Sequence, residues 1–300
     1  MIRLALLILL LAPGVAVAAP PTNDAPGGAA SFEEYFGSNG TPEERQAVID
    51  LSEATADKGV PRCLGAGSFA RTVWLEVPAA DTVRRVAIEA SSPSGGTSEV
   101  PDLALYVGGQ SKVAQSCDGA AVGTLATSAA AVEAVVPPGR PVLVQIGRSG
   151  EQMEQRVVAS LRADAVKDAA RPPAGDVGRK PPELAVATRG TVKLAGATLS
   201  AEDPAQPACP APATVWRRTP ITARGRYRVK VRGTDAGSVT VFSGARPSAG
   251  NAIACENRRK PKSALTAVVQ LKRGSVLWTR VGADEIGPRA RATAIVKRLR

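Results

Sequence analysis

The two halves of this 300-residue sequence repeat each other, and this repeat is the strongest constraint on the fold. Four phrases of the first half recur in the second half in the same order. They are Leu51–Thr55 and Leu194–Thr198, Thr72–Trp74 and Thr214–Trp216, Leu103–Gly108 and Val239–Gly244, and Gly139–Gly147 and Gly274–Gly282. Solenoids repeat units of about 20 to 50 residues, whereas a repeat of about 100 residues or more has the length of a whole domain. The sequence therefore predicts a duplicated domain.

Each half is predicted to consist of short β-strands. Apolar and polar side chains alternate over residues 226–232, where Tyr227 and two valines would face a core and four cations would face water. Turn signals such as Pro93–Gly96 and Pro137–Gly139 separate the strand-like runs. No segment between them has helical periodicity over about 10 to 15 residues, which disfavours βαβ units. We predict an all-β protein with two tandem antiparallel β-sandwich domains, or jelly rolls.

A single short helix is predicted near the N-terminus, from Thr41 to about Ala54. Thr41 would be the N-cap, Pro42 would occupy the first helical position, and Glu44 would complete a capping box. The far end of this segment overlaps the first repeated phrase. We therefore expect the helix to end near Asp50.

Residues 1–18 are typical of an export signal. Arg3 supplies a positive start, Leu4–Leu11 an apolar run, and Ala16–Ala18 a small-x-small cleavage site. A membrane-spanning helix needs about 20 apolar residues, roughly twice the length of this run. No cysteine lies near the cleavage site, which excludes the lipid-modified cysteine of a bacterial lipoprotein. We expect cleavage before Ala19 and a soluble product that is extracellular, periplasmic or held at the cell envelope.

The remaining chain is expected to divide into four parts. Residues 19–47 would be a flexible N-terminal segment, rich in Pro, Ala and Gly at its start and containing the short helix. Residues 48–163 would form the first β-sandwich domain, and residues 188–300 the second. Residues 164–187, which contain two Pro-Pro pairs, would form a semi-rigid linker between the domains.

Four cysteines, an even number in a chain with an export signal, predict two disulfides. They are Cys63, Cys117, Cys209 and Cys255. Zinc binding is disfavoured because no two of them form a C-x-x-C pair. Four cysteines allow three pairings, and their order alone does not choose among these. Only 3% of residues are aromatic, so Trp74 and Trp216, which follow a cysteine in each half, are expected to be core anchors beside a disulfide rather than ligand platforms.

The order of these motifs resembles that of bacterial pre-peptidase C-terminal domains. Seven motifs occur in the same order in both halves. They are Ala-Thr, a proline, a cysteine, Thr-Val-Trp, a strand with Tyr or Phe, a second cysteine followed by an acid, and a late strand between glycines. The resemblance implies a jelly-roll β-sandwich in each half. It also implies disulfides within each half, Cys63 with Cys117 and Cys209 with Cys255. A binding role follows as well, because some members bind protein or calcium.

The chain departs from that family's pattern in two respects. Asp102 lies where members often have an acid, but Ser238 occupies the matching place in the second half. No peptidase domain precedes either copy in this sequence. The departures argue against calcium binding and against a role as a peptidase accessory.

The absence of histidine narrows the chemistry further. It excludes Ser-His-Asp and Cys-His nucleophile systems, the HExxH motif and histidine-based metal sites. The carboxylates of the first half could in principle form a glycoside-hydrolase pair, but no motif surrounds them. They are Asp81, Glu89, Asp102, Asp118 and Glu133. We predict a non-catalytic binding or scaffolding protein without metal or cofactor; the alternative is a carboxylate-dependent secreted glycan hydrolase or an accessory protein to one.

Positive charge is concentrated in the second half. The formal net charge is +11, yet residues 19–163 contain 11 Lys/Arg and 17 Asp/Glu, whereas residues 209–300 contain 20 and 4. The alternation over residues 226–232 would place four cations on one face of a strand, and more cations follow Cys255. The candidate anion-binding residues are Arg226, Arg228, Lys230, Arg232, Arg258, Arg259 and Lys260.

Two interpretations of these cations remain open. They could bind an anionic polymer, glycan or protein of the cell envelope, or they could only solvate a sheet and protect its edges. Nucleic acid is a disfavoured partner because of the export signal and the scarcity of aromatic residues for stacking. Arg289, Arg291 and Lys297 are taken as reference cations outside the predicted stripe.

Overall fold

The computed structural model describes residues 22–31, 45–56, 69–94, 100–109, 114–119, 129–148, 155–167, 169, 171–176, 180–204, 208–258 and 263–300. Outside these ranges lie the predicted export signal at residues 1–18, Cys63, and the cations Arg259 and Lys260. The described residues form strands and two short 3₁₀ turns, η1 (Pro26–Gly28) and η4 (Ala249–Asn251), and contain no α-helix.

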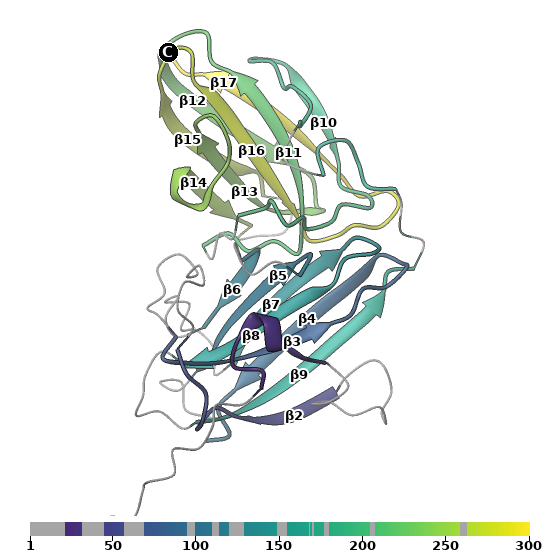
Figure 1. Cartoon of the computed structure of the whole chain (residues 1–300). Coiled ribbons are helices and arrows are strands. Elements are labelled where there is room, and N and C mark those ends of the chain that lie inside the picture. The colour runs from purple at the N-terminus through teal and green to yellow at the C-terminus, as the bar shows by residue number, and fades with distance from the viewer. Residues whose placement is uncertain are drawn as a thin grey trace, which may run out of the picture.

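The strands form two β-sandwiches, one below the other in Figure 1. The first module comprises β1 to β9. One of its sheets has the order β1-β3-β8-β5-β6 and the other β2-β9-β4-β7. The strands are β1 (Ala30–Ser31), β2 (Arg45–Asp50), β3 (Arg71–Val77), β4 (Arg84–Ser91), β5 (Asp102–Val107), β6 (Ser116–Asp118), β7 (Ala129–Val136), β8 (Val142–Arg148) and β9 (Arg156–Ala165).

The second module comprises β10 to β17. Its sheets have the orders β11-β16-β13-β14 and β10-β17-β12-β15. The strands are β10 (Arg189–Lys193), β11 (Ala213–Pro220), β12 (Gly225–Arg232), β13 (Ala236–Ser243), β14 (Ala252–Asn257), β15 (Leu265–Leu271), β16 (Val276–Ala283) and β17 (Arg291–Arg298).

The two modules share one topology. The order β3-β8-β5-β6 corresponds to β11-β16-β13-β14, and β2-β9-β4-β7 corresponds to β10-β17-β12-β15. The register agrees as well, because Trp74 lies opposite Gln145 and Trp216 lies opposite Arg280. Every pairing within these eight-strand sets is antiparallel. The predicted all-β fold with two tandem sandwiches is therefore confirmed.

The predicted helix from Thr41 to Ala54 was wrong. Residues 45–50 form β2, which pairs along its whole length with β9. Ile49 is fully buried, whereas Gln46, Val48 and Asp50 are exposed, so the segment alternates as a strand does. The capping signals are local, and pairing with a neighbouring strand outweighs such preferences. Residues 41–44 lie outside the described part of the chain.

One pair of aromatic side chains occupies equivalent places in the two modules. Trp74 packs against Tyr106 and Trp216 against Phe242, with ring centroids 5.2 Å apart in both cases. Both tryptophans are fully buried, in small clusters separate from the aliphatic core of each sandwich. The cluster of Trp74 includes Cys117. The tryptophans are therefore packing residues, as the sequence predicted.

The predicted disulfide of the second module is formed. Cys209 and Cys255 are bonded, with their Cα atoms 5.9 Å apart. Cys117 is disulfide-bonded too. Its expected partner, Cys63, lies outside the described residues. The pairing within the second module is the one implied by the family resemblance.

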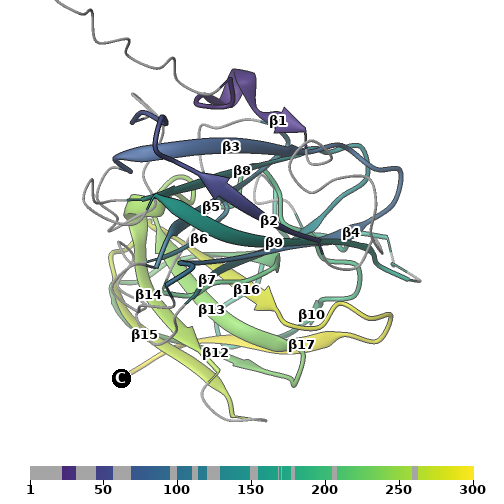
Figure 2. The ribbon, with the colours of Figure 1, turned by 90° about the horizontal axis from the view of Figure 1, so that it is seen from below.

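Two segments outside the repeated sets of eight strands bind to β3 and β11. The N–H of Trp74 donates to the carbonyl of Asn23 at 2.8 Å, and β1 runs parallel to β3 at the sheet edge in Figure 2. Likewise, the N–H of Trp216 donates to the carbonyl of Gly175 at 2.7 Å, and Leu184 is buried in the core. The described residues of the N-terminal segment, which was expected to be flexible, thus cover one sandwich edge. Those of the expected linker cover the other.

The modules also contact each other directly. The N–H of Val135 donates to the carbonyl of Pro212 at 2.6 Å, and the N–H of Leu199 donates to the carbonyl of Val135 at 2.7 Å. The side chain of Val135 packs with the core of the second module, and that of Leu199 packs with the core of the first. One end of the second module therefore rests on β7 of the first (Figure 1).

Candidate functional site

Strand β12 carries a row of cations on one face. Tyr227, Val229 and Val231 are almost completely buried in the core. Because side chains alternate across a strand, the intervening positions point away from the core. They are Arg226, Arg228, Lys230 and Arg232, which are exposed or half-buried. The sequence prediction placed these four side chains together correctly.

The neighbouring strands add cations that the sequence did not single out for this site. In register, Arg228 lies opposite Lys297, and Lys193 lies opposite Arg291. Residues directly opposite each other in an antiparallel pair share a face. We call the resulting surface the cationic face. It consists of eight side chains, Arg189, Lys193, Arg226, Arg228, Lys230, Arg232, Arg291 and Lys297.

The cationic face has no acid of its own. The four strands that form its sheet, β10, β17, β12 and β15, contain no Asp or Glu. A shallow depression of about 150 Å³ lies at its centre and is lined by five of the cations together with Thr293 and Ile295. Like charges held side by side repel each other, so the face is electrostatically suited to an anion.

The equivalent face of the first module carries charges of both signs. Its outward positions on β2, β9, β4 and β7 mix three arginines with four acids. Where the second module has Lys193 opposite Arg291, the first has Asp50 opposite Arg156. Arg156 contributes to lowering the pKa of Asp50, after the larger contribution of hydrogen bonds from Ser52. The concentration of positive charge is therefore specific to the second module.

The other predicted candidates lie elsewhere. Arg258 donates hydrogen bonds to the carbonyls of Ala236 and Ser263, at 2.8 and 3.0 Å, and so joins two loops. Arg259 and Lys260 lie outside the described residues. Two of the three reference cations, Arg291 and Lys297, belong to the cationic face, because strand pairing brings β17 next to β12.

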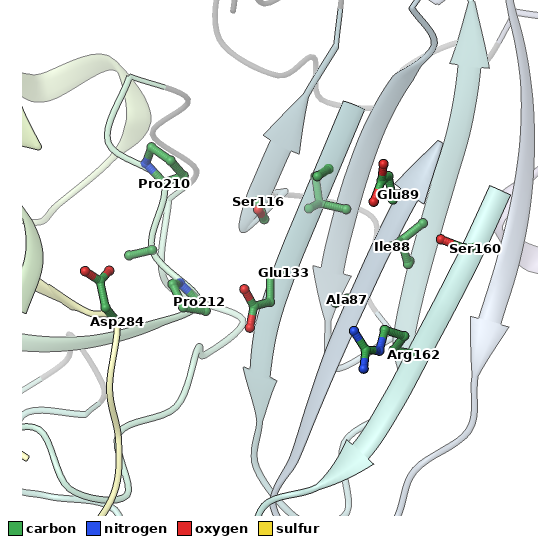
Figure 3. A pocket seen from close by; sticks show the side chains of 13 residues that line it. Ala87, Ile88, Glu89, Ser116, Glu133, Ser160, Arg162, Pro210, Pro212 and Asp284 are labelled. Carbon is green, nitrogen blue, oxygen red and sulfur yellow. The ribbon is translucent and has the colours of Figure 1, made fainter. Parts of the chain in front are cut away.

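A cavity between the modules gathers acids (Figure 3). It measures about 430 Å³ and is lined by Glu89, Glu133 and Arg162 of the first module and by Pro212 and Asp284 of the second. Glu133 forms an ion pair with Arg85 at 2.9 Å. Partial burial raises the pKa of Asp284. The cavity thus places carboxylates from both modules near one another.

The remaining acids considered for catalysis are apart from this cavity. Asp102 is buried, at 1% exposure. The carboxylate of Asp118 accepts hydrogen bonds from the N–H groups of Gly119 and Ala131, at 2.9 and 2.8 Å, which is a structural use. Asp81 lies exposed in a turn. Within the described ranges, no cluster of three or more metal-binding side chains is present, and no helix is long and apolar enough to cross a membrane.

Comparison with known proteins gives low similarity throughout. No family model and no curated protein sequence matches the chain. The structure is similar to the pre-peptidase C-terminal domain of collagenase from Bacillus anthracis, at 13% identity and a TM-score of 0.28, over 43% of this chain and 100% of that one. The comparisons thus include the family that the sequence resembles.

Two tandem modules are similar over most of the chain. The tandem CBM51 modules of Sp3GH98 from Streptococcus pneumoniae SP3-BS71 match at 11% identity and a TM-score of 0.22, over 83% of this chain and 98% of theirs. The CBM22-1-CBM22-2 tandem domain of Xyn10C from Paenibacillus barcinonensis matches at 10% identity and a TM-score of 0.23, over 88% and 96%. At such scores the function has to be argued from this chain's own residues.

Proposed function

We propose that this protein is an exported, non-catalytic binding protein whose second module holds an anionic polymer against the cationic face. The observation that carries the proposal is the register of β10, β17 and β12, which gathers eight cations on one surface of a sheet without an acid. Charged side chains of either sign would solvate the outer face of a sheet, and the equivalent face of the first module does carry both signs.

The geometry favours a polymer over a compact anion. Alternate residues along a strand are about 7 Å apart, so the cations of β12 are spread over about 20 Å. A single small anion could contact only part of this row. A chain with regularly spaced negative groups could contact all of it, and each contact would strengthen the others through effective concentration.

Export supports an envelope or extracellular ligand. Residues 1–18 have the composition of an export signal, and the second module contains a disulfide. Disulfides persist in oxidising compartments outside the cytoplasm. Anionic polymers of the cell surface and its surroundings are the ligands of fitting charge there.

The alternative, a carboxylate-dependent glycan hydrolase, would use the cavity between the modules. One of the carboxylates there, Glu133, is already paired with Arg85. Its carboxylate is thus held in a structural ion pair, whereas a general acid has to be free to reach the bond that is cleaved. We therefore prefer the binding role.

Retention of the full chain on immobilised dextran sulfate tests the proposal. The double variant Arg228→Glu, Lys230→Glu should elute at a much lower salt concentration than the unmodified protein. The matched variant Arg246→Glu, Arg273→Glu changes the net charge equally at two exposed positions away from the face, and it should elute close to the unmodified protein. Equal losses in the two variants would mean general attraction, and the proposed site would be rejected.

A further inference from the structure

A second concentration of positive charge lines a larger cavity beside the cationic face. A cavity of about 910 Å³ opens where the edge strands β10 and β11 meet residues 171–174 and the loop before β17. Among the described residues, five cations line it and no acid does. They are Arg171, Lys193, Arg217, Arg289 and Arg291. Three prolines, Pro172, Pro173 and Pro288, also line it and stiffen its walls.

The cavity continues the cationic face. Lys193 and Arg291, which lie opposite each other on β10 and β17, belong to the face and line the cavity as well. Asp235 accepts a hydrogen bond from the backbone N–H of Arg291 at 2.8 Å, but its side chain is not part of the lining. Like charges directly opposite each other are unfavourable in a sheet, so an anion between the two side chains would relieve their repulsion.

Arg217 gives independent evidence that the cavity is built for an anion. It is only 8% exposed, and its guanidinium donates to the carbonyls of Ala174 and Trp216, at 3.1 and 2.8 Å. A third bond, at 3.3 Å, reaches the carbonyl of Thr191. No described carboxylate forms an ion pair with it. The three carbonyls satisfy part of the guanidinium but carry no full negative charge, so an anion in the cavity would supply the counter-charge that this buried cation lacks.

The residue equivalent to Arg217 in the first module is not charged. Trp74 and Trp216 are equivalent in register, so the residue after each is equivalent too. In the first module that residue is Leu75, which packs in the aliphatic core. The second module has an arginine at the edge of a cationic cavity where the first has a core leucine.

We propose that this cavity binds a terminal phosphate monoester, such as the phosphorylated end or side group of a surface polymer. A phosphate monoester carries about −1.5 to −2 charges at neutral pH and three strong acceptor oxygens. One carboxylate offers only two oxygens and a single charge, which leaves several of the five cations uncompensated. A volume of about 910 Å³ also has room for the sugar or polyol that carries the phosphate.

The proposal deepens the proposed function and rests on it for the origin of the phosphate in a polymer. Calorimetry with the full chain compares three probes that share the ring configuration of glucose and carry their anionic group at carbon 6: glucose 6-phosphate, glucose 6-sulfate and glucuronate. We expect glucose 6-phosphate to bind at least about tenfold more tightly than either of the others. Equal binding of the three, or tighter binding of glucuronate or the sulfate, would overturn the assignment to phosphate.

Variants locate the binding. Arg171→Gln with Arg289→Gln should weaken glucose 6-phosphate binding by about tenfold or more, because charge-assisted hydrogen bonds are lost. Two matched variants, Arg228→Gln with Lys230→Gln on the face and Arg246→Gln with Arg273→Gln elsewhere, should change it less than about threefold. Similar losses in all three variants would reject the cavity.

Arg217→Leu introduces the residue that the first module has at this position. It should keep the fold and lower phosphate-sugar binding by about tenfold. Should this buried variant not fold, the exposed pair Arg171 and Arg289 still decides the question. Retention on dextran sulfate that depends on Arg228 and Lys230, together with no binding of glucose 6-phosphate, would leave the polymer face standing and reject the cavity alone.

Discussion

Thr198 donates two hydrogen bonds to the carboxylate of Asp176, one from its backbone N–H and one from its hydroxyl, both at 2.6 Å. Asp176 is only 6% exposed, and burial raises its pKa to about 7. In the first module, Thr55 donates the same two bonds to Asp24. This contact ties the segment beside each edge strand to the repeated Leu-x-x-Ala-Thr phrase.

The raised pKa of Asp176 predicts a loss of stability as the pH rises. Between about pH 4, where the unfolded carboxyl titrates, and about pH 7, the folded protein holds a proton that the unfolded chain has lost. The free energy of unfolding should therefore fall by up to about 4 kcal/mol across this window. Urea unfolding at pH 4.5 and pH 8 measures it. Asp176→Asn should reduce the fall, and an equal fall in both proteins would contradict this account.

The buried Asp203 and Arg280 are predicted to depend on each other. Burial raises the pKa of Asp203 and lowers that of Arg280 to about 10, while each charge partly offsets the effect on the other. Arg280→Gln, which introduces the residue of the first module, Gln145, should cost about 1.5 to 3 kcal/mol because the hydrogen bonds of Arg280 to the carbonyls of Pro204 and Cys209 are lost and Asp203 loses a nearby cation.

Adding Asp203→Asn should return part of that loss. A double-mutant cycle from urea unfolding should give a coupling of at least about 1 kcal/mol. Additive losses would mean that the two side chains act separately.

Removal of the disulfide of the second module should destabilise the chain strongly. Cys209→Ala with Cys255→Ala frees a loop whose ends are 46 residues apart, and the free energy of unfolding should fall by about 2 to 5 kcal/mol. Peptide mapping without reduction should show Cys209 joined to Cys255, and also Cys63 joined to Cys117. A link between cysteines of different modules would contradict the pairing.

Lys193→Asp should weaken binding to anionic polymers and increase the stability of the fold. It would recreate opposite Arg291 the complementary pair that Asp50 and Arg156 form in the first module. Replacing like by opposite charges across a strand pair should raise the free energy of unfolding by roughly 0.2 to 1 kcal/mol. Elution from dextran sulfate should at the same time shift to lower salt. A variant that is both less stable and equally well retained would contradict a ligand-directed role of Lys193.

Much of the fold could be predicted because its signals are local or repeated. The alternation around Tyr227 identified β12 and one row of cations, and the order of the motifs identified the duplication. The strand at residues 45–50 could not be predicted, since Thr41, Pro42 and Glu44 look like a helix start and its partner β9 lies more than a hundred residues away.

The site was only partly predictable for the same reason. That Lys297 lies beside Arg228 depends on which strands pair, and spacing along the chain does not contain this information. Arg217 gave no signal, because Arg217 and Arg218 follow Trp216 as an ordinary basic pair. Arg217 stands out only in the structure, where it is buried at the position that Leu75 occupies in the first module.

The contact between the modules has a thermodynamic consequence. Val135 of the first module belongs to the core of the second, and Leu199 of the second belongs to the core of the first. Each core lacks one of its side chains when the other module unfolds. The two modules should therefore unfold as one cooperative unit and not independently. Calorimetry should then show a single transition whose enthalpy matches its van't Hoff value.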